Sequence, residues 1–244
     1  MIVAFLADVE YTFSTASTQI WIPSTDIQKW KTMHLGIDSY LRMSKTEGIR
    51  GAGITDIGLT AGFLPFEKIQ GEIGVDYLYM GDSNYDDYPV YFNMKLAMPE
   101  GAIFKGSPAI AAGAYNVGTK KDFTNYNIFY GLIAKSIPVL GRISAGYYYG
   151  NEKLLVDENL EKSNSGLLLS WDRTMSEISD KLWLAVDYQG GMNYLGSVNF
   201  GASWAFSKNV SVIFGYDIYN NKNAYYNTAN QNANTFTVQV DINF

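Results

Sequence analysis

The stretch TFTVQVDINF, Thr235 to Phe244, decides the fold. Polar and apolar residues alternate along it without interruption, and the apolar ones are Phe236, Val238, Val240, Ile242 and Phe244. Alternation with a period of two predicts a β-strand with one apolar and one polar face. A strand at the edge of a sheet usually carries Lys or Pro, which prevent pairing with further strands, and this stretch has neither. We therefore expect it to pair on both sides, as in a closed barrel.

Composition points to a single all-β domain with few charges. Of the 244 residues 17% are charged, against roughly 25% in a typical soluble domain, and Tyr, Phe and Gly are abundant. The net charge of −6 disfavours nucleic acid as a partner. The absence of cysteine excludes disulfides, thiolate metal sites and covalently attached haem. Since no run of 18 apolar residues occurs, the sequence predicts no transmembrane helix.

Similar amphipathic segments recur along the chain without a linker or a change in composition. With the final stretch they make twelve, at residues 33–41, 56–63, 71–79, 90–98, 109–115, 127–135, 142–150, 166–171, 181–189, 197–206, 210–219 and 235–244. The segments at 109–115 and 166–171 are too uniform or too short for their faces to be assigned. The expected fold is a closed antiparallel transmembrane β-barrel of twelve strands. Fourteen strands are the alternative, with residues 9–22 in an extra hairpin.

The composition of the two faces indicates which one points outward. The polar faces hold Gly, Ser, Thr and Asn with few Lys or Glu, unlike the exterior of a soluble barrel. The apolar faces carry aromatic residues toward the strand ends, as at Tyr77, Tyr79, Tyr147 and Tyr149. Aromatic girdles beside an apolar band are typical of barrels that face lipid. We therefore expect the apolar faces outside and the polar faces in the lumen.

Connection lengths set the orientation. If the final strand ends in the periplasm, the inner turns are short, for example IPVL at 137–140 and SKN at 207–209. The outer loops are then longer and more polar, for example 151–163 and 220–234. Short periplasmic turns and longer outer loops are the pattern of bacterial barrels with an even number of strands.

The chain resembles bacterial outer-membrane β-barrel proteins over about residues 31–244. In that class a final amphipathic strand with a terminal aromatic residue is the signal read by the barrel-assembly machinery. The matching positions here are Phe236, Val238, Val240, Ile242 and Phe244. The resemblance implies a location in the bacterial outer membrane, contact with its lipid and lipopolysaccharide, and the assembly machinery as a partner. It leaves the function and the oligomeric state open.

The predicted lumen carries charges of both signs. The candidate lumen-lining residues, which could set selectivity, are His34, Asp38, Arg42, Glu72, Asp76, Lys95, Lys135, Arg142, Trp183, Asp187 and Asp217. The bulky aromatic residues Tyr40, Tyr91, Phe129 and Tyr148 are also expected to point inward. A mixed-charge lumen predicts a narrow passive, porin-like channel for ions or small polar solutes. The alternative is a structural or binding protein with an occluded lumen and partner-binding outer loops.

Catalysis, cofactors and metals are not expected. The single histidine, His34, falls on the predicted lumen face near the periplasmic end of its strand, where the rim chemistry of barrel hydrolases is not found. We expect it to hydrogen-bond to neighbours such as Asp38. The acidic loop that contains Asp82, Asp86 and Asp87 does not match the spacing of a calcium loop, and a solvated surface loop explains it better.

The N-terminal residues 1–29 form a segment separate from the barrel, which covers residues 30–244. Residues 1–7 are either the remnant of a signal peptide or an ordinary terminus. Residues 8–29 are expected in the lumen as a plug, in an extra strand, or at the periplasmic rim, and the sequence does not choose between these places.

Overall fold

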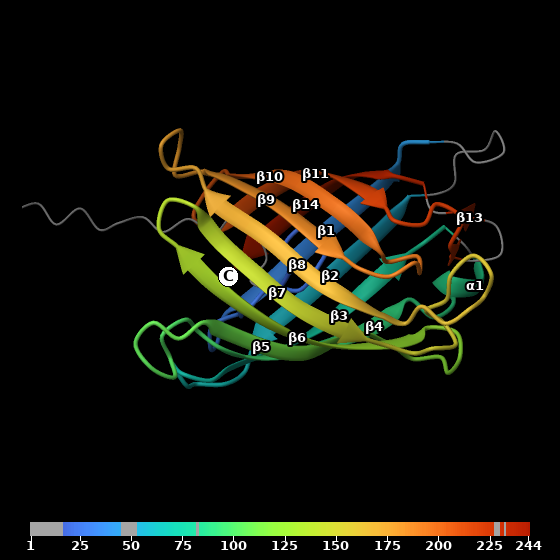
Figure 1. The fold of residues 1–244 in the computed structure, drawn as a ribbon, viewed down its shortest axis with the longest axis horizontal. Coiled ribbons are helices and arrows are strands. Elements are labelled where there is room, and N and C mark those ends of the chain that lie inside the picture. Colours follow the sequence, from blue (N-terminus) through green and yellow to red (C-terminus); the bar gives the residue numbers. More distant parts are fainter. Residues whose placement is uncertain (1–16, 45–52, 82, 227–229, 232) are drawn as a thin grey trace, which may run out of the picture.

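Twelve strands close into one antiparallel barrel in the computed structural model, which describes residues 17–44, 53–81, 83–226, 230–231 and 233–244 (Figure 1). The barrel strands are β1 (Met33–Arg42), β2 (Ile54–Gly62), β3 (Gln70–Tyr79), β4 (Val90–Met98), β5 (Ala109–Gly118), β6 (Asn125–Ile137), β7 (Gly141–Tyr149), β8 (Ser165–Thr174), β9 (Leu182–Gln189), β10 (Ser197–Ala205), β11 (Val210–Tyr219) and β14 (Thr235–Asn243). The predicted fold class is confirmed. The two-residue strands β12 (Tyr225–Tyr226) and β13 (Asn230–Gln231) pair only with each other, so they do not make a fourteen-stranded barrel.

The final strand closes the barrel. β14 pairs with β1 on one side, where Val240 lies opposite Ile37, and with β11 on the other, where Val240 lies opposite Val212. Beyond the end of β14, Phe244 exchanges two backbone hydrogen bonds with Met33, of 2.7 and 2.9 Å. Because both edges of β14 are paired, the strand needs no Lys or Pro to block further pairing.

The outer surface of the barrel is apolar, as expected for a barrel that faces lipid. Large apolar side chains from strands all round the barrel are exposed, among them Ile73 (52%), Leu167 (53%) and Phe214 (48%). Tyr79 and Tyr149, at the loop ends of β3 and β7, are likewise exposed. The interior carries the opposite pattern, since Asp187, Asp217 and other polar residues are buried. The barrel is therefore of the inverted, membrane type.

On β6 the predicted assignment of faces is wrong. Ile128 and Leu132 point inward and are almost fully buried, whereas Phe129 is 59% exposed on the outer surface. Both faces of this strand are rich in apolar residues, so alternation could not distinguish them. A register shift in the pairing of β5 with β6, between Tyr115 and Val117, was also invisible in the sequence.

Lys135, which shares the outer face of β6 with Phe129, is consequently not a lumen residue. Its Nζ atom donates a hydrogen bond of 2.5 Å to Glu100 Oε1 in the turn between β4 and β5. This ammonium group holds the pKa of Glu100 below its usual value. Lys135 therefore belongs to an exposed ion pair at the turn end of the barrel.

The two ends of the barrel differ as the connection lengths predict. One end carries the short turns, such as 138–140 between β6 and β7, and the other carries the long loops (Figure 1). The loop end includes the short helix α1 (Ser83–Asp86) together with β12 and β13. Within the described ranges, no helix is long and apolar enough to cross a membrane.

Candidate functional site

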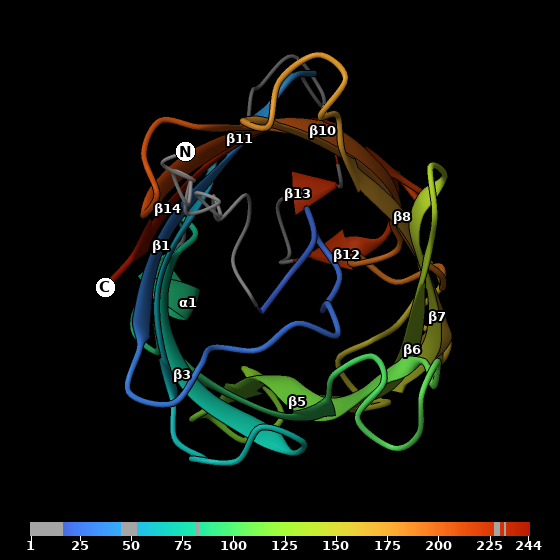
Figure 2. The ribbon, with the colours of Figure 1, turned by 90° about the vertical axis from the view of Figure 1, so that its left-hand side faces the viewer.

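Residues 17–30, here called the inner segment, run from the interior of the barrel to its turn end (Figure 2). Residues 17–24 fold into a tight turn, because Gln19 N donates to Ile22 O (2.8 Å) and Ser24 N donates to Ser17 O (3.0 Å). After Trp30 pairs beside Gly62, the chain enters β1. Of the three places left open for residues 8–29, the structure places residues 17–25 in the interior and the exposed Asp26 and Lys29 at the turn end, and residues 8–16 lie outside the described part.

Asp187 on β9 binds the tip of the inner segment. Its Oδ2 atom accepts backbone hydrogen bonds from Ile20 (2.9 Å), Trp21 (2.9 Å) and, more weakly, Ile22 (3.4 Å). Its Oδ1 atom accepts a hydrogen bond of 2.7 Å from Asn199 on β10. A buried carboxylate is stable only when it is paired or hydrogen-bonded, and these donors satisfy that requirement.

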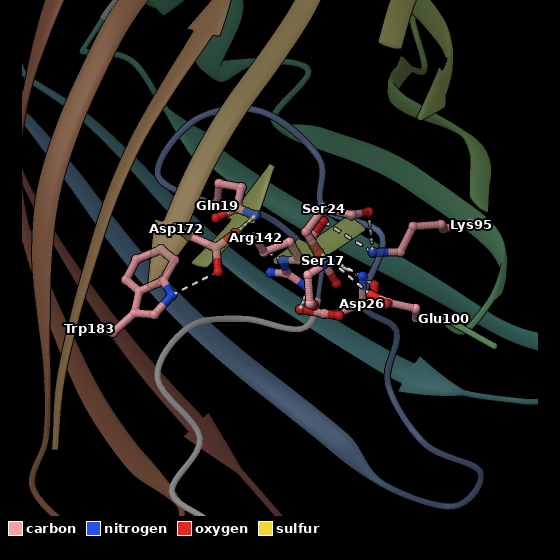
Figure 3. Close-up of polar contacts among 10 residues, drawn as sticks. Ser17, Gln19, Ser24, Asp26, Lys95, Glu100, Arg142, Asp172 and Trp183 are labelled. Carbon is pink, nitrogen blue, oxygen red and sulfur yellow. Dashed lines mark hydrogen bonds and ion pairs between the residues drawn. The ribbon is translucent and has the colours of Figure 1, made fainter. Parts of the chain in front are cut away.

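A second anchor lies on β3 and β4. Lys95 Nζ forms an ion pair of 3.1 Å with Glu72 Oε1, and both side chains are almost fully buried. The same ammonium donates to the carbonyl oxygens of Ser17 (3.1 Å) and Ser24 (3.4 Å), so it holds both ends of the turn (Figure 3). Glu72 Oε2 accepts a hydrogen bond of 2.7 Å from Gln28 N.

A third anchor lies at the turn end of β7 and β8. Arg142 bridges Asp26 of the inner segment (2.6 Å) and Asp172 of the wall (2.9 Å) (Figure 3). Asp172 also accepts hydrogen bonds from Gln19 (3.1 Å) and from the indole of Trp183 (3.2 Å). The ion pair of Asp26 with Arg142 and the hydrogen bond of Gln19 to Asp172 thus fix the inner segment to this side of the barrel, and Trp183 helps to hold Asp172 in place.

His34 does not contact the partner that the sequence suggested. Its Nδ1 atom lies 3.1 Å from Asn243 Oδ1, and its Nε2 atom lies 3.5 Å from Asp241 Oδ1. Asp241 belongs to β14, which is far from β1 in the sequence but next to it in the barrel. Only the closure of the barrel brings these groups together.

The remaining candidates lie on the interior or at its rim. The side chains of Asp38, Asp76 and Asp217 point inward, and Thr235 donates a hydrogen bond of 2.6 Å to Asp217. Arg42 lies at the loop end of β1, opposite Thr235. A role of the interior residues in selectivity stays a prediction.

The inner segment lies between two cavities. The first, of about 210 Å³, is bounded by Ser17, Trp21 and the walls of β1 to β4. The second, of about 960 Å³, opens at the turn end and is bounded by Asp26, Lys29 and the ends of β7 and β8. The two cavities therefore touch different parts of the same segment.

An apolar cluster fills much of the interior beside β4 to β8. Tyr148 and Leu168 from the wall and Leu155 from the loop after β7 are fully buried in it. Tyr91 stacks on Tyr126, with ring centroids 6.4 Å apart. Aromatic side chains thus fill space in the interior.

Sequence reasoning missed Asp172 and Asp26. Asp172 comes directly after the segment 166–171, which was too short to assign, although β8 continues to Thr174. Asp26 lies in the inner segment, where no periodicity indicates its surroundings. In the parts of the chain that the structure describes, no three His, Cys, Asp or Glu side chains are placed to hold a metal ion.

Comparison with known proteins supports the fold. The structure is similar to that of the NanC porin, with a TM-score of 0.50 and 8% identity over 86% of this chain and 98% of that one. It is also similar to Salmonella typhi OmpF in complex with daunomycin, with a TM-score of 0.43 and 10% identity over 87% of this chain and 96% of that one. No family model and no curated protein matches the sequence. At these identities the likeness to the NanC porin concerns the fold alone.

Proposed function

We propose that the protein is a porin-like channel of the bacterial outer membrane for small ions or small polar solutes, and that the inner segment closes it in the described state. One observation carries this proposal: a single segment, anchored to the wall by polar contacts, lies between two cavities of the interior. When the segment moves, its hydrogen bonds and ion pairs can be replaced by hydrogen bonds to water, whereas its buried apolar side chains Ile20, Ile22 and Ile27 have to leave their contacts in the interior.

The polar interior favours a hydrated lumen. Buried ion pairs such as that of Lys95 with Glu72 carry a desolvation cost that a dry interior has to offset completely. Water that enters when the segment moves would solvate these groups. The same groups would then line the open path.

A second candidate is a structural or binding protein whose lumen stays occluded. The apolar cluster around Tyr148, Leu155 and Leu168 favours it, because this cluster joins the wall to an outer loop and would not open by exchange with water. In this case the long loops would be the functional surface.

Conductance in planar bilayers distinguishes the two candidates. We expect the wild-type protein to be mostly closed with brief openings, and Asp187→Ala to raise the open fraction because it removes the acceptor for Ile20 and Trp21. Asp180→Ala, at an exposed position in the turn between β8 and β9, is the matched control and should behave as wild type. Silent wild-type and Asp187→Ala proteins, both folded by heat-modifiable migration, would support the occluded protein instead.

We also propose the bacterial outer membrane as the location, with lipid and lipopolysaccharide around the apolar band and the barrel-assembly machinery as the partner in biogenesis. The exposed apolar surface and the complete pairing of β14 support this proposal.

A further inference from the structure

The cavity of about 210 Å³ between the inner segment and the wall has a distinct acidic side. Asp38 on β1 lies directly opposite Asp56 on β2. Asp76 on β3 follows on the same inner face, opposite Tyr91 on β4. We call Asp38, Asp56 and Asp76 the acidic ladder. Like charges directly opposite each other on neighbouring strands are destabilising, and more so in a medium of low dielectric constant.

The basic groups of the cavity bind elsewhere. Among the described residues that line it, Lys95 is the one Lys or Arg, and it contacts Glu72 and the inner segment. His34 lines the same cavity but contacts Asn243 and Asp241. None of the salt bridges found in the described chain includes a member of the acidic ladder. No cation of the described wall therefore pairs with the acidic ladder, and a bound cation would stabilise its carboxylates.

Polar atoms at the ladder also lack hydrogen-bond partners. The Oδ1 atoms of Asp38 and Asp56 are buried, and no described residue donates a hydrogen bond to either. The Tyr91 side chain, which lines the cavity, is 1% exposed, and its hydroxyl group has no partner in the described structure either. A buried polar group without a hydrogen-bond partner is destabilising. The Tyr91 hydroxyl group is a neutral donor on the wall, and the Oδ1 atoms of Asp38 and Asp56 are acceptors on the same cavity. A bound polar molecule would form hydrogen bonds with these groups.

Besides polar residues such as Asn93 and Gln189, the cavity is lined by two pairs of aromatic side chains. Trp21 of the inner segment meets Tyr40 edge to face, with ring centroids 5.2 Å apart, and both line the cavity. Tyr115 and Tyr130 form a second pair on the β5 and β6 side, with centroids 5.8 Å apart. Aromatic faces attract cations and pack well against apolar groups.

Glycine keeps the space beside the carboxylates free. A Cβ atom at Gly58 would lie 2.8 Å from Asp76 Oδ1, so a larger residue there would displace this carboxylate. For scale, a cavity of about 150 Å³ in another protein holds a benzene molecule. The cavity here therefore suits a small molecule of about one ring.

We propose that this cavity binds a small organic cation, an ammonium group on an apolar body, with the ammonium at the acidic ladder and the body against Trp21 and Tyr40. A bare metal ion fits less well, because the described residues hold no group of three metal ligands. The site does not depend on the proposed channel, since a closed barrel can still bind a ligand in its interior.

Calorimetry on the protein folded in detergent tests the site. The probe is 2-phenylethylamine, and the matched compounds are the neutral 2-phenylethanol and the anionic phenylacetate. We expect the amine to bind at least about tenfold more tightly than either, because each charge-assisted hydrogen bond lost costs a factor of this order. Asp38→Asn and Asp56→Asn should each weaken the amine about tenfold, while Asp180→Asn should not. Heat-modifiable migration checks that each variant is folded.

Three results of these titrations would overturn the proposal, and a fourth comes from competition with calcium. They are no binding of the amine to the folded wild-type protein, equal binding of the amine and the alcohol, and unchanged binding in both ladder variants. Calcium is the competitor in a parallel titration. If calcium displaces the amine at a concentration lower than the amine needs for its own binding, the cavity is a metal site and the organic-cation proposal is rejected. Since none of these readouts involves conductance, a silent bilayer leaves this proposal standing.

Discussion

At the scale of single residues, one carboxylate organises the tip of the inner segment. Asp187 receives backbone N–H groups from consecutive residues, Ile20 and Trp21, which a neutral side chain could not satisfy as well. It is 1% exposed, so water cannot easily replace it. The position of the inner segment therefore depends on this residue more than on any surface ion pair, since exposed pairs contribute little.

Asp187→Ala should lower the free energy of unfolding by about 2–4 kcal/mol, because it leaves buried N–H groups without an acceptor. Asp187→Asn should lose less, since its amide oxygen still accepts. Urea titration in lipid vesicles measures both, and Asp180→Ala, at an exposed turn position, should stay within about 0.5 kcal/mol of wild type. Equal stability of Asp187→Ala and Asp180→Ala would show that the segment is held by its apolar contacts instead.

A charged side chain on the outer face should destabilise the barrel most near the middle of a strand. Phe214, in the middle of β11, is 48% exposed on the apolar surface. Phe214→Arg should cost about 2–4 kcal/mol in lipid vesicles, because a charge near the bilayer midplane is poorly solvated. Val139→Arg, in the turn after β6 and 83% exposed, should cost about 1 kcal/mol or less, since charge is tolerated near the interface. A reversed order of the two would place the apolar band away from lipid.

At the scale of elements, periodicity predicted most strands and their faces. The alternation predicted the inner and outer faces correctly where one face was polar, as in β1, in which His34, Asp38 and Tyr40 share the inner side. It was wrong on β6, where both faces are apolar and neighbouring strands, not the strand itself, decide the orientation. In the inner segment, polar and apolar residues follow no regular period. Its place comes from contacts with residues 44 or more positions away, such as Glu72 and Asp187, and a single sequence does not show which distant residues meet.

Assembly of the barrel depends on β14, because this strand pairs on both of its edges. Ile242 lies opposite Leu35 on one side and Val210 on the other, and Phe244 forms two backbone hydrogen bonds with Met33. Deletion of Phe244, or Ile242→Asp, should reduce the fraction of assembled barrel, because every backbone group in lipid must be paired. Heat-modifiable migration and surface level in cells measure this fraction. Normal values in both variants would contradict the role of β14 as the closing and signal strand.

At the scale of the whole molecule, apolar packing and polar contacts together fill the interior. The apolar cluster beside β4 to β8 packs like a protein core and joins the wall to the loop that contains Leu155. The inner segment contributes Ile22 and Ile27 to this cluster, and hydrogen bonds and ion pairs hold the rest of the segment, in which Lys95 and Arg142 each contact both the wall and the segment. In the proposed channel, a path across the barrel would run beside the acidic ladder on β1 to β3, where polar residues line the interior.

An engineered disulfide between the inner segment and the barrel wall tests whether the segment closes this path. An ideal Cβ atom at Gly215 lies 3.3 Å from Ile20 Cγ2, so cysteines at the two positions would have Cβ atoms within roughly 5 Å, near the spacing of a disulfide. The same Cβ would lie 2.8 Å from Thr237 Cγ2, and Thr237→Ser removes that methyl group while keeping the hydroxyl that Gln239 contacts. Because the chain has no cysteine of its own, Ile20→Cys with Gly215→Cys in this background forms one defined bridge.

The locked protein should stay closed in planar bilayers under oxidising conditions and regain its openings when a reductant is added. Each single cysteine variant in the Thr237→Ser background is the control, and it should open equally under both conditions. Openings that persist in the fully oxidised double variant would mean that ions pass without movement of the inner segment. In that case residues 17–30 line a permanent path and do not close it.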